Sequence, residues 1–173
     1  MNAYATDIFP GVSMSEKITP NDRRDALEFA QTAKARFETT ELAAEKYGLD
    51  LQSVKDLGDE ILDGIHRGGQ QDNVLWVLEI ATAMITAVMA VNGEPLPVAQ
   101  QVDPASYAMS VLRDLASDAA AKGLDWSELE RTAANLLRKA DETGHNNAEA
   151  FWALNRATAQ LELAWARDMA AGQ

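Results

Sequence analysis

The chain contains no cysteine and only two histidines, which excludes several kinds of chemistry at the outset. Without cysteine there are no disulfides, no thiolate zinc ligands and no thiol nucleophile, a composition compatible with a reducing compartment. A histidine-based triad would have to use His66 or His145, and both stand where glycines end a predicted helix. Histidine is expected to cap a helix there, because a cation interacts favourably with the carboxyl end of the helix dipole.

Basic residues are also scarce: 15 Lys and Arg face 27 Asp and Glu, which gives a net charge of -12 over 173 residues. This negative charge opposes attraction to nucleic-acid phosphates and to anionic lipid surfaces. Direct nucleic-acid binding is therefore disfavoured, and a protein partner with a basic surface is expected. The first 17 residues contain Asp7 before any Lys and no long apolar run, so they predict no secretory signal, and cytoplasmic residence is the default.

One long apolar stretch is present, from residue 73 to 92, and Glu79 is its only charge. A helix that is apolar on every face is either the core of a bundle or a membrane span. The stretch is short for a span and has no Lys or Arg within five residues of either end. We therefore predict a central core helix and no membrane span. A lone carboxylate at position 79 must then reach a partner group, a metal or the surface.

Capping and breaker residues divide the rest of the chain into helices. Residues 1–18 lack a sustained hydrophobic period and are predicted to form an extended arm, and residues 19–173 are predicted to form a single all-α domain of about six helices. The expected helices begin after caps and end at glycines. They run from Pro20, after Thr19, to Tyr47; from about 51 to 65; from 73 to 92; from Pro104, after Asp103, to Lys122; from Asp125 to about Thr143; and onward from Asn146 and Asn147.

Two features of these helices bear on packing. Thr39 and Thr40, both β-branched, mark a point where the first helix could be interrupted. The last helix has a heptad-like apolar stripe, so we expect it to close the bundle or to pair with a copy of itself as a homo-oligomer. The stripe consists of Phe151, Leu154, Thr158, Leu161 and Trp165.

Acidic residues are concentrated between Gly48 and His66, where Lys55 is the only lysine. The five acids are Asp50, Asp56, Asp59, Glu60 and Asp63. No catalytic pattern in the chain is complete. The sequence therefore predicts a non-enzymatic interaction protein, regulatory, inhibitory or assembly-forming, whose acidic surface binds a basic partner, such as a nucleic-acid-binding protein. No cofactor is expected under this interpretation.

A metal site is the alternative. Glu38 and Glu41 project from one face of the first helix, and Asp56 and Asp59 project from one face of the next. If the two helices run antiparallel, the four carboxylates could surround Mg²⁺, which prefers oxygen ligands. Such a metal would activate water for attack on a nucleotide phosphate.

The same residues carry a family resemblance over about 26 positions. Glu38-Thr-Thr-Glu41 and Asp56-Leu-Gly-Asp59, with Glu60-Ile-Leu-Asp63 as a second candidate, resemble the ExxE and ExxD patterns of the MazG-type all-α nucleotide pyrophosphohydrolases. Asp56 stands where that pattern has Glu. The resemblance implies Glu38, Glu41, Asp56 and Asp59 as metal ligands, with Lys34 or Lys55 near the phosphates.

Residues 40–57 also resemble the helix-turn-helix pattern of DNA-binding regulators. Ala44 is placed to pack between helices, Gly48 to make the turn, and Val54 and Leu57 to seat the second helix. The exposed positions of that second helix are acidic, which would repel a phosphate backbone. A helix corner of this shape without DNA is favoured, and DNA binding is kept as a third hypothesis.

Overall fold

The computed structural model describes residues 20–67, 73–97 and 101–171, and within these ranges it is all-α, as predicted. The predicted arm at residues 1–18 and the Thr19 cap lie outside the described residues. The six helices in the described ranges are α2 (Pro20–Tyr47), α3 (Leu51–Arg67), α4 (Val74–Val91), α5 (Pro104–Ala121), α6 (Trp126–Glu142) and α7 (Asn147–Ala171).

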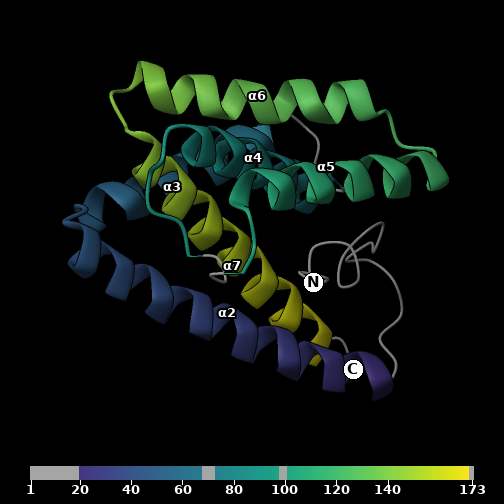
Figure 1. Cartoon of the computed structure of the whole chain (residues 1–173). Helices are drawn as coiled ribbons and strands as arrows, with labels where there is room; N and C mark the ends of the chain where they lie inside the picture. Colours follow the sequence, from purple (N-terminus) through teal and green to yellow (C-terminus); the bar gives the residue numbers. More distant parts are fainter. Residues whose placement is uncertain (1–19, 68–72, 98–100, 172–173) are drawn as a thin grey trace.

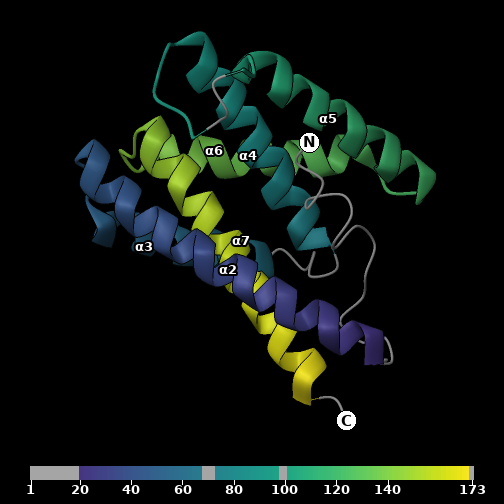
Figure 2. The same ribbon diagram turned by 60° about the horizontal axis from the view of Figure 1, so that its bottom comes forward.

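The helices form two groups that share α7. On one side, α2 and α3 pack against α7; on the other, α7 packs against α4, which is also covered by α5 and α6 (Figure 1). Figure 2 shows α7 running between α2 and the group formed by α4, α5 and α6. The single central helix expected from the sequence is therefore one of a central pair, α4 and α7.

The helix α4 is a core helix. It is the one described helix long and apolar enough to span a membrane, with a mean hydropathy of 2.1, yet 61% of it is buried inside the protein. Leu78, Ile80 and Val77 are fully covered. This burial confirms the expectation of a core helix, because a helix that is apolar on every face needs neighbours on several sides.

The helix ends follow the capping residues seen in the sequence. Asp103 and Asp125 accept hydrogen bonds from the backbone N–H groups of Ser106 and Glu128, at 3.1 and 3.3 Å. Asn146 and Glu149 form a reciprocal capping box, in which each side chain accepts from the other residue's backbone N–H. These bonds satisfy amide groups that have no partner within the helix.

Four helices end in the same way. At Gly48 the backbone turns left-handed, with φ of 67°, and the N–H of Leu49 donates to the carbonyl of Ala44 at 2.8 Å. Glycine adopts this conformation without steric cost, which is why the helix ends where the sequence places it. The same turn ends α4, α5 and α6, at Gly93, Gly123 and Gly144.

The expected interruption at Thr39 and Thr40 does not occur, and α2 is continuous through both. Their hydroxyls donate to the carbonyls of Ala35 and Arg36, at 2.7 and 2.8 Å. These bonds within the helix satisfy the hydroxyls, so the β-branched pair is accommodated.

Antiparallel packing of α2 on α7 is evident from three side-chain contacts. Phe29 lies against Trp165, with ring centroids 4.7 Å apart. Further along α2, Arg36 pairs with Glu162, and the guanidinium of Arg156 lies 4.7 Å from the centroid of the Phe37 ring. The order along α7 decreases as the order along α2 increases, so the two helices run in opposite directions.

The backbones of α3 and α7 approach closely at Gly58. A Cβ placed on Gly58 would lie 3.3 Å from the carbonyl oxygen of Ala153 in α7. Gly64, in the same helix, has open space around it. The packing of α3 on α7 therefore requires a residue without a side chain at position 58, whereas position 64 can accept a side chain.

These two glycines give a matched stability test. Gly64→Ala should raise the free energy of unfolding by about 0.5–1 kcal/mol, because alanine favours the helix. Gly58→Ala should give none of this gain, and Gly58→Leu should lower the free energy by roughly 3 kcal/mol or more through overpacking. Urea unfolding monitored by circular dichroism measures all three. Equal gains from both alanine variants would contradict the close approach.

Candidate functional site

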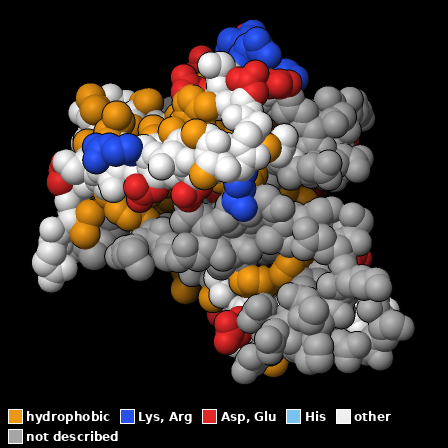
Figure 3. Space-filling view, turned by 90° about the vertical axis from the view of Figure 1, so that its right-hand side faces the viewer, with side chains coloured by type: hydrophobic (Ala, Val, Ile, Leu, Met, Phe, Trp, Pro, Cys, Tyr) orange, Lys and Arg blue, Asp and Glu red, His pale blue; other side chains and the backbone are white. Residues whose placement is uncertain are grey.

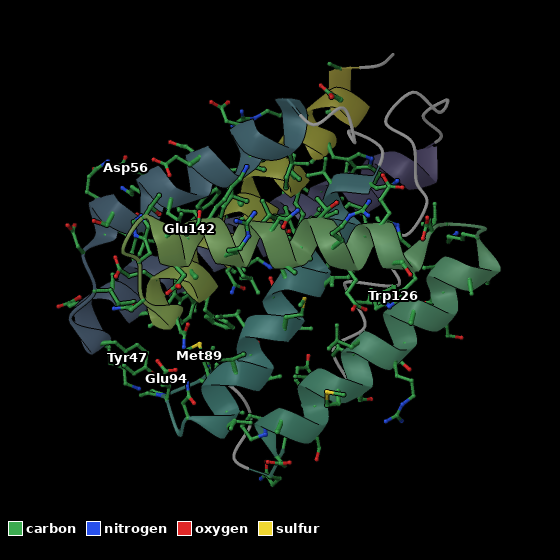
Figure 4. The ribbon with its side chains drawn as sticks, turned by 90° about the horizontal axis from the view of Figure 1, so that it is seen from above. Tyr47, Asp56, Met89, Glu94, Trp126 and Glu142 are labelled. Carbon is green, nitrogen blue, oxygen red and sulfur yellow. The ribbon has the colours of Figure 1, made fainter. Side chains whose placement is uncertain are left out.

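The acidic residues predicted to bind a partner are all exposed on or before α3. Asp50, Asp56, Asp59, Glu60 and Asp63 face solvent, whereas Val54, Leu57, Ile61 and Ile65 of the same helix are buried. Asp50 also has a structural role, since its carboxylate caps α3 by accepting from the backbone N–H of Gln52 at 3.0 Å. Figure 4 shows Asp56 at the outer edge of the molecule.

The acidic side chains border an open depression of about 610 Å³. Asp59, Glu60, Leu62 and Asp63 line it. Asp59 accepts a hydrogen bond from Gln160 of α7 at 3.2 Å. Elsewhere the charges are mixed: Figure 3 shows basic and acidic side chains interspersed with hydrophobic ones on the face where α5 joins α6.

The carboxylates of the alternative metal site do not form such a site in the structure. Glu38 and Glu41 are exposed on α2, and α2 makes few contacts with α3, because both helices pack on α7. In the described part of the chain, no three His, Asp or Glu side chains lie in an arrangement that could hold a metal ion. The magnesium-dependent activity stays a prediction without a preformed ligand set.

The residues that resemble a helix-turn-helix occupy the expected kinds of position. Ala44, Val54 and Leu57 are buried, and Gly48 makes the turn. However, α3 is seated mainly on α7 and only slightly on α2. The corner is therefore part of the larger bundle, and DNA binding stays a hypothesis.

A buried group of charges lies between α2, α4 and α7; the sequence pointed to Glu79 as a carboxylate in need of a partner, but sequence reasoning missed Arg36 and Glu162. Arg36 of α2 lies 3.4 Å from Glu162 of α7, and the two side chains are only 11% and 1% exposed. Glu79 of α4 is buried beside them and interacts electrostatically with both. Glu79 thus contacts Arg36 and Glu162 and not the acids of residues 38–63, and it is 9% exposed. In the sequence, the only indication that Glu162 would be buried was its position beside Leu161, which belongs to the apolar stripe of α7.

Burial determines the protonation of the two glutamates. Loss of hydration raises the pKa of Glu162 to about 7, with Arg36 opposing this shift and Glu79 adding to it. Burial likewise raises the pKa of Glu79, and Arg36 opposes the rise. Oε2 of Glu162 has no hydrogen-bond partner among the described residues. A proton on one carboxyl relieves the repulsion between two buried acids that share one guanidinium.

Polar contacts also occur at the end of the molecule where α2 and α4 both end. Tyr47, Met89 and Glu94 lie at this end in Figure 4. Glu94 accepts a hydrogen bond from Asn147 at 3.0 Å, which ties the 92–97 connection to the start of α7. His145 lies 3.5 Å from Glu149, within the turn before α7. His66 belongs to α3, and its side chain lies outside the described residues. These contacts join helix ends and bring together no catalytic set.

Comparisons with protein-family models, with curated proteins and with solved structures find no match to the chain.

The buried glutamate should make the stability depend on pH. The pKa of Glu162 is about 7 when folded, against an ordinary 4.5, so the folded state holds this proton more tightly. Binding of this proton therefore stabilises the folded state fully below about pH 4.5, and this contribution is lost as the pH rises through about 7. The free energy of unfolding should therefore fall from about pH 5 to pH 8, with this group contributing up to about 3 kcal/mol.

Glu162→Gln tests this assignment by keeping the volume and removing the titration. Urea unfolding at several pH values should give a clearly shallower pH dependence for this variant than for the wild type. Glu130→Gln, at an exposed glutamate of α6, controls for loss of one negative charge. An unchanged slope in Glu162→Gln would show that other groups cause the pH dependence.

The metal hypothesis has a direct assay. Because no three carboxylates of the described residues are grouped to hold a metal ion, we expect no pyrophosphate release from a panel of nucleoside triphosphates with Mg²⁺ or Mn²⁺. Turnover that depends on the metal and disappears in Glu41→Gln would contradict this expectation and would establish the alternative activity. Glu45→Gln, one turn further along α2, is the matched control.

Proposed function

We propose that the protein is a non-enzymatic interaction protein whose acidic α3 face binds a basic surface on another protein. The α3 face is defined by Asp56, Asp59, Glu60 and Asp63. Its partner presents Arg or Lys side chains, and a nucleic-acid-binding surface is one such partner. Occupying that surface would make the protein an inhibitor or regulator of the partner.

The single observation that carries the proposal is the concentration of exposed carboxylates on one helix whose other face is buried. Because α3 is fixed on α7 by Val54, Leu57 and Ile61, the carboxylates are held in place without any partner. A preorganised charged face loses less conformational freedom on binding.

The depression beside α3 favours long basic side chains. Leu62 lines it together with the acids and is partly buried against the core. The aliphatic part of an Arg or Lys can lie on such an apolar side chain while its charge meets the carboxylates. Glu60 makes no hydrogen bond or ion pair within the described part of the chain, so its carboxylate is open to a partner.

The overall charge supports the choice of partner. A net charge of -12 steers a basic protein toward this molecule and repels nucleic acid and anionic membranes. Such steering acts mainly on the association rate and weakens as salt increases. Binding through α3 should therefore be strongest at low ionic strength.

Charge-neutral variants test the proposed face. Replacing the four acids by Asn or Gln should weaken binding of a labelled Arg-rich peptide by roughly tenfold or more, since each exposed ion pair contributes about 0.2–1 kcal/mol. The same variant should retain less protein from a cell extract. Fluorescence anisotropy at low salt measures the first effect, and quantitative mass spectrometry of immobilised samples measures the second.

The control removes the same charge elsewhere. Asp114, Glu130, Asp141 and Asp168 are exposed on α5, α6 and α7, and their neutralisation should change peptide affinity by less than about threefold. Equal losses in both variants would mean that net charge alone attracts the peptide, and no loss in the α3 variant would exclude the proposed face.

A further inference from the structure

A small cavity lies between α4 and α5, on the side of α4 that carries Glu79. Its volume is about 40 Å³, and it is open on one side. This space holds about three non-hydrogen atoms, because a single water needs roughly 10–15 Å³ by this measure. The described residues that line it are Glu79, Thr82, Ala83 and Thr86 of α4 and Tyr107, Ala108 and Val111 of α5.

The hydroxyls of α4 in this cavity are hydrogen-bond acceptors. Thr82 donates its hydroxyl proton to the carbonyl of Leu78, and Thr86 donates to the carbonyl of Thr82, both at 2.7 Å. A hydroxyl has one proton and two lone pairs. With the proton already used, each oxygen can only accept a hydrogen bond from a molecule in the cavity.

Glu79 adds a buried carboxyl to the same wall. The residue is 9% exposed, and no hydrogen bond from the described part of the chain reaches its side chain. Glu79, Thr82 and Thr86 are three, four and seven positions apart, so they lie along one face of the helix. The α4 side of the cavity therefore presents the carboxyl oxygens of Glu79 and the hydroxyl oxygens of Thr82 and Thr86 as acceptors, and α4 supplies no donor to them.

The charges behind the cavity are unbalanced. Glu79 and Glu162 share the single guanidinium of Arg36, so ionisation of both carboxyls leaves an excess negative charge in the core. A buried charge without compensation is costly, and either a proton or a bound cation removes the excess.

We propose that this cavity binds a small protonated primary amine, with Glu79 as its counter-ion and the hydroxyls of Thr82 and Thr86 as additional acceptors. A primary ammonium group has three N–H donors and no acceptor, which complements this wall. Its carbon substituent would contact Ala83, Ala108 and Val111 or extend through the open side. The site is separate from the α3 face and does not depend on the function proposed for it.

Methylammonium chloride is the probe. Amide NMR spectra of the wild-type protein should show saturable shifts confined to α4 and α5, with a Kd in the millimolar range, as expected for a ligand of about two non-hydrogen atoms. Tetramethylammonium chloride has the same charge but no N–H donor and a larger volume, so it should give no saturable shift. Saturation by tetramethylammonium or potassium at the same concentrations, or no saturation by methylammonium, would overturn the proposal.

Two variants locate the site. Glu79→Gln should weaken methylammonium binding at least tenfold, because a charge-assisted hydrogen bond is lost. Since Glu79 also lies beside Arg36, Thr86→Val provides a second test that leaves the buried charges in place, and it should weaken binding about threefold or more. Thr132→Val, which removes an equivalent hydroxyl on α6, should have no effect. Unchanged affinity in both cavity variants would place the amine elsewhere.

Discussion

Coverage of α7 on several sides is the packing constraint on which the rest of the structure depends. From Ala150 to Leu154 every residue is buried, so this helix needs neighbours all around it. It obtains them from α2, α3 and α4, and the many alanines of α7 let these neighbours approach closely. Gly58 allows a close approach of α3. Because α4 in turn needs α5 and α6, two groups of helices form around one pair of core helices.

The buried charges contribute specificity to this packing more than stability. Removing Arg36, Glu79 and Glu162 from water is costly, and their mutual attraction offsets this cost only in part. The pair does, however, define one register of α2 on α7, since a shift by one turn would leave a buried guanidinium opposite an apolar side chain. The aromatic contact of Phe29 with Trp165 and the contact of Arg156 with Phe37 select the same register.

The helices could be predicted from the sequence because their ends are determined locally. Asp103, Asp125 and the glycines at 48, 93, 123 and 144 mark boundaries through bonds that span a few residues. The assignment of the 73–92 stretch to the core also needed only composition and length. The buried role of Glu162 and the cavity beside Glu79 could not be predicted in this way, because they depend on which helices meet. The separation of Glu38 and Glu41 from Asp56 and Asp59 has the same cause: the intervening turn does not specify that both helices pack on α7.

The pairing of α2 with α7 also has a consequence for synthesis. The first described helix finds its principal partner in the last, so α2 leaves the ribosome more than a hundred residues before the surface that covers it. During that interval the buried face of α2, which includes Ala33, Thr40 and Ala44, stays exposed, and Arg36 stays hydrated. Contacts between such distant segments form late, because the loop between them must close first. The core is therefore completed only after α7 has been translated, and α2 depends until then on its own helical propensity or on a chaperone.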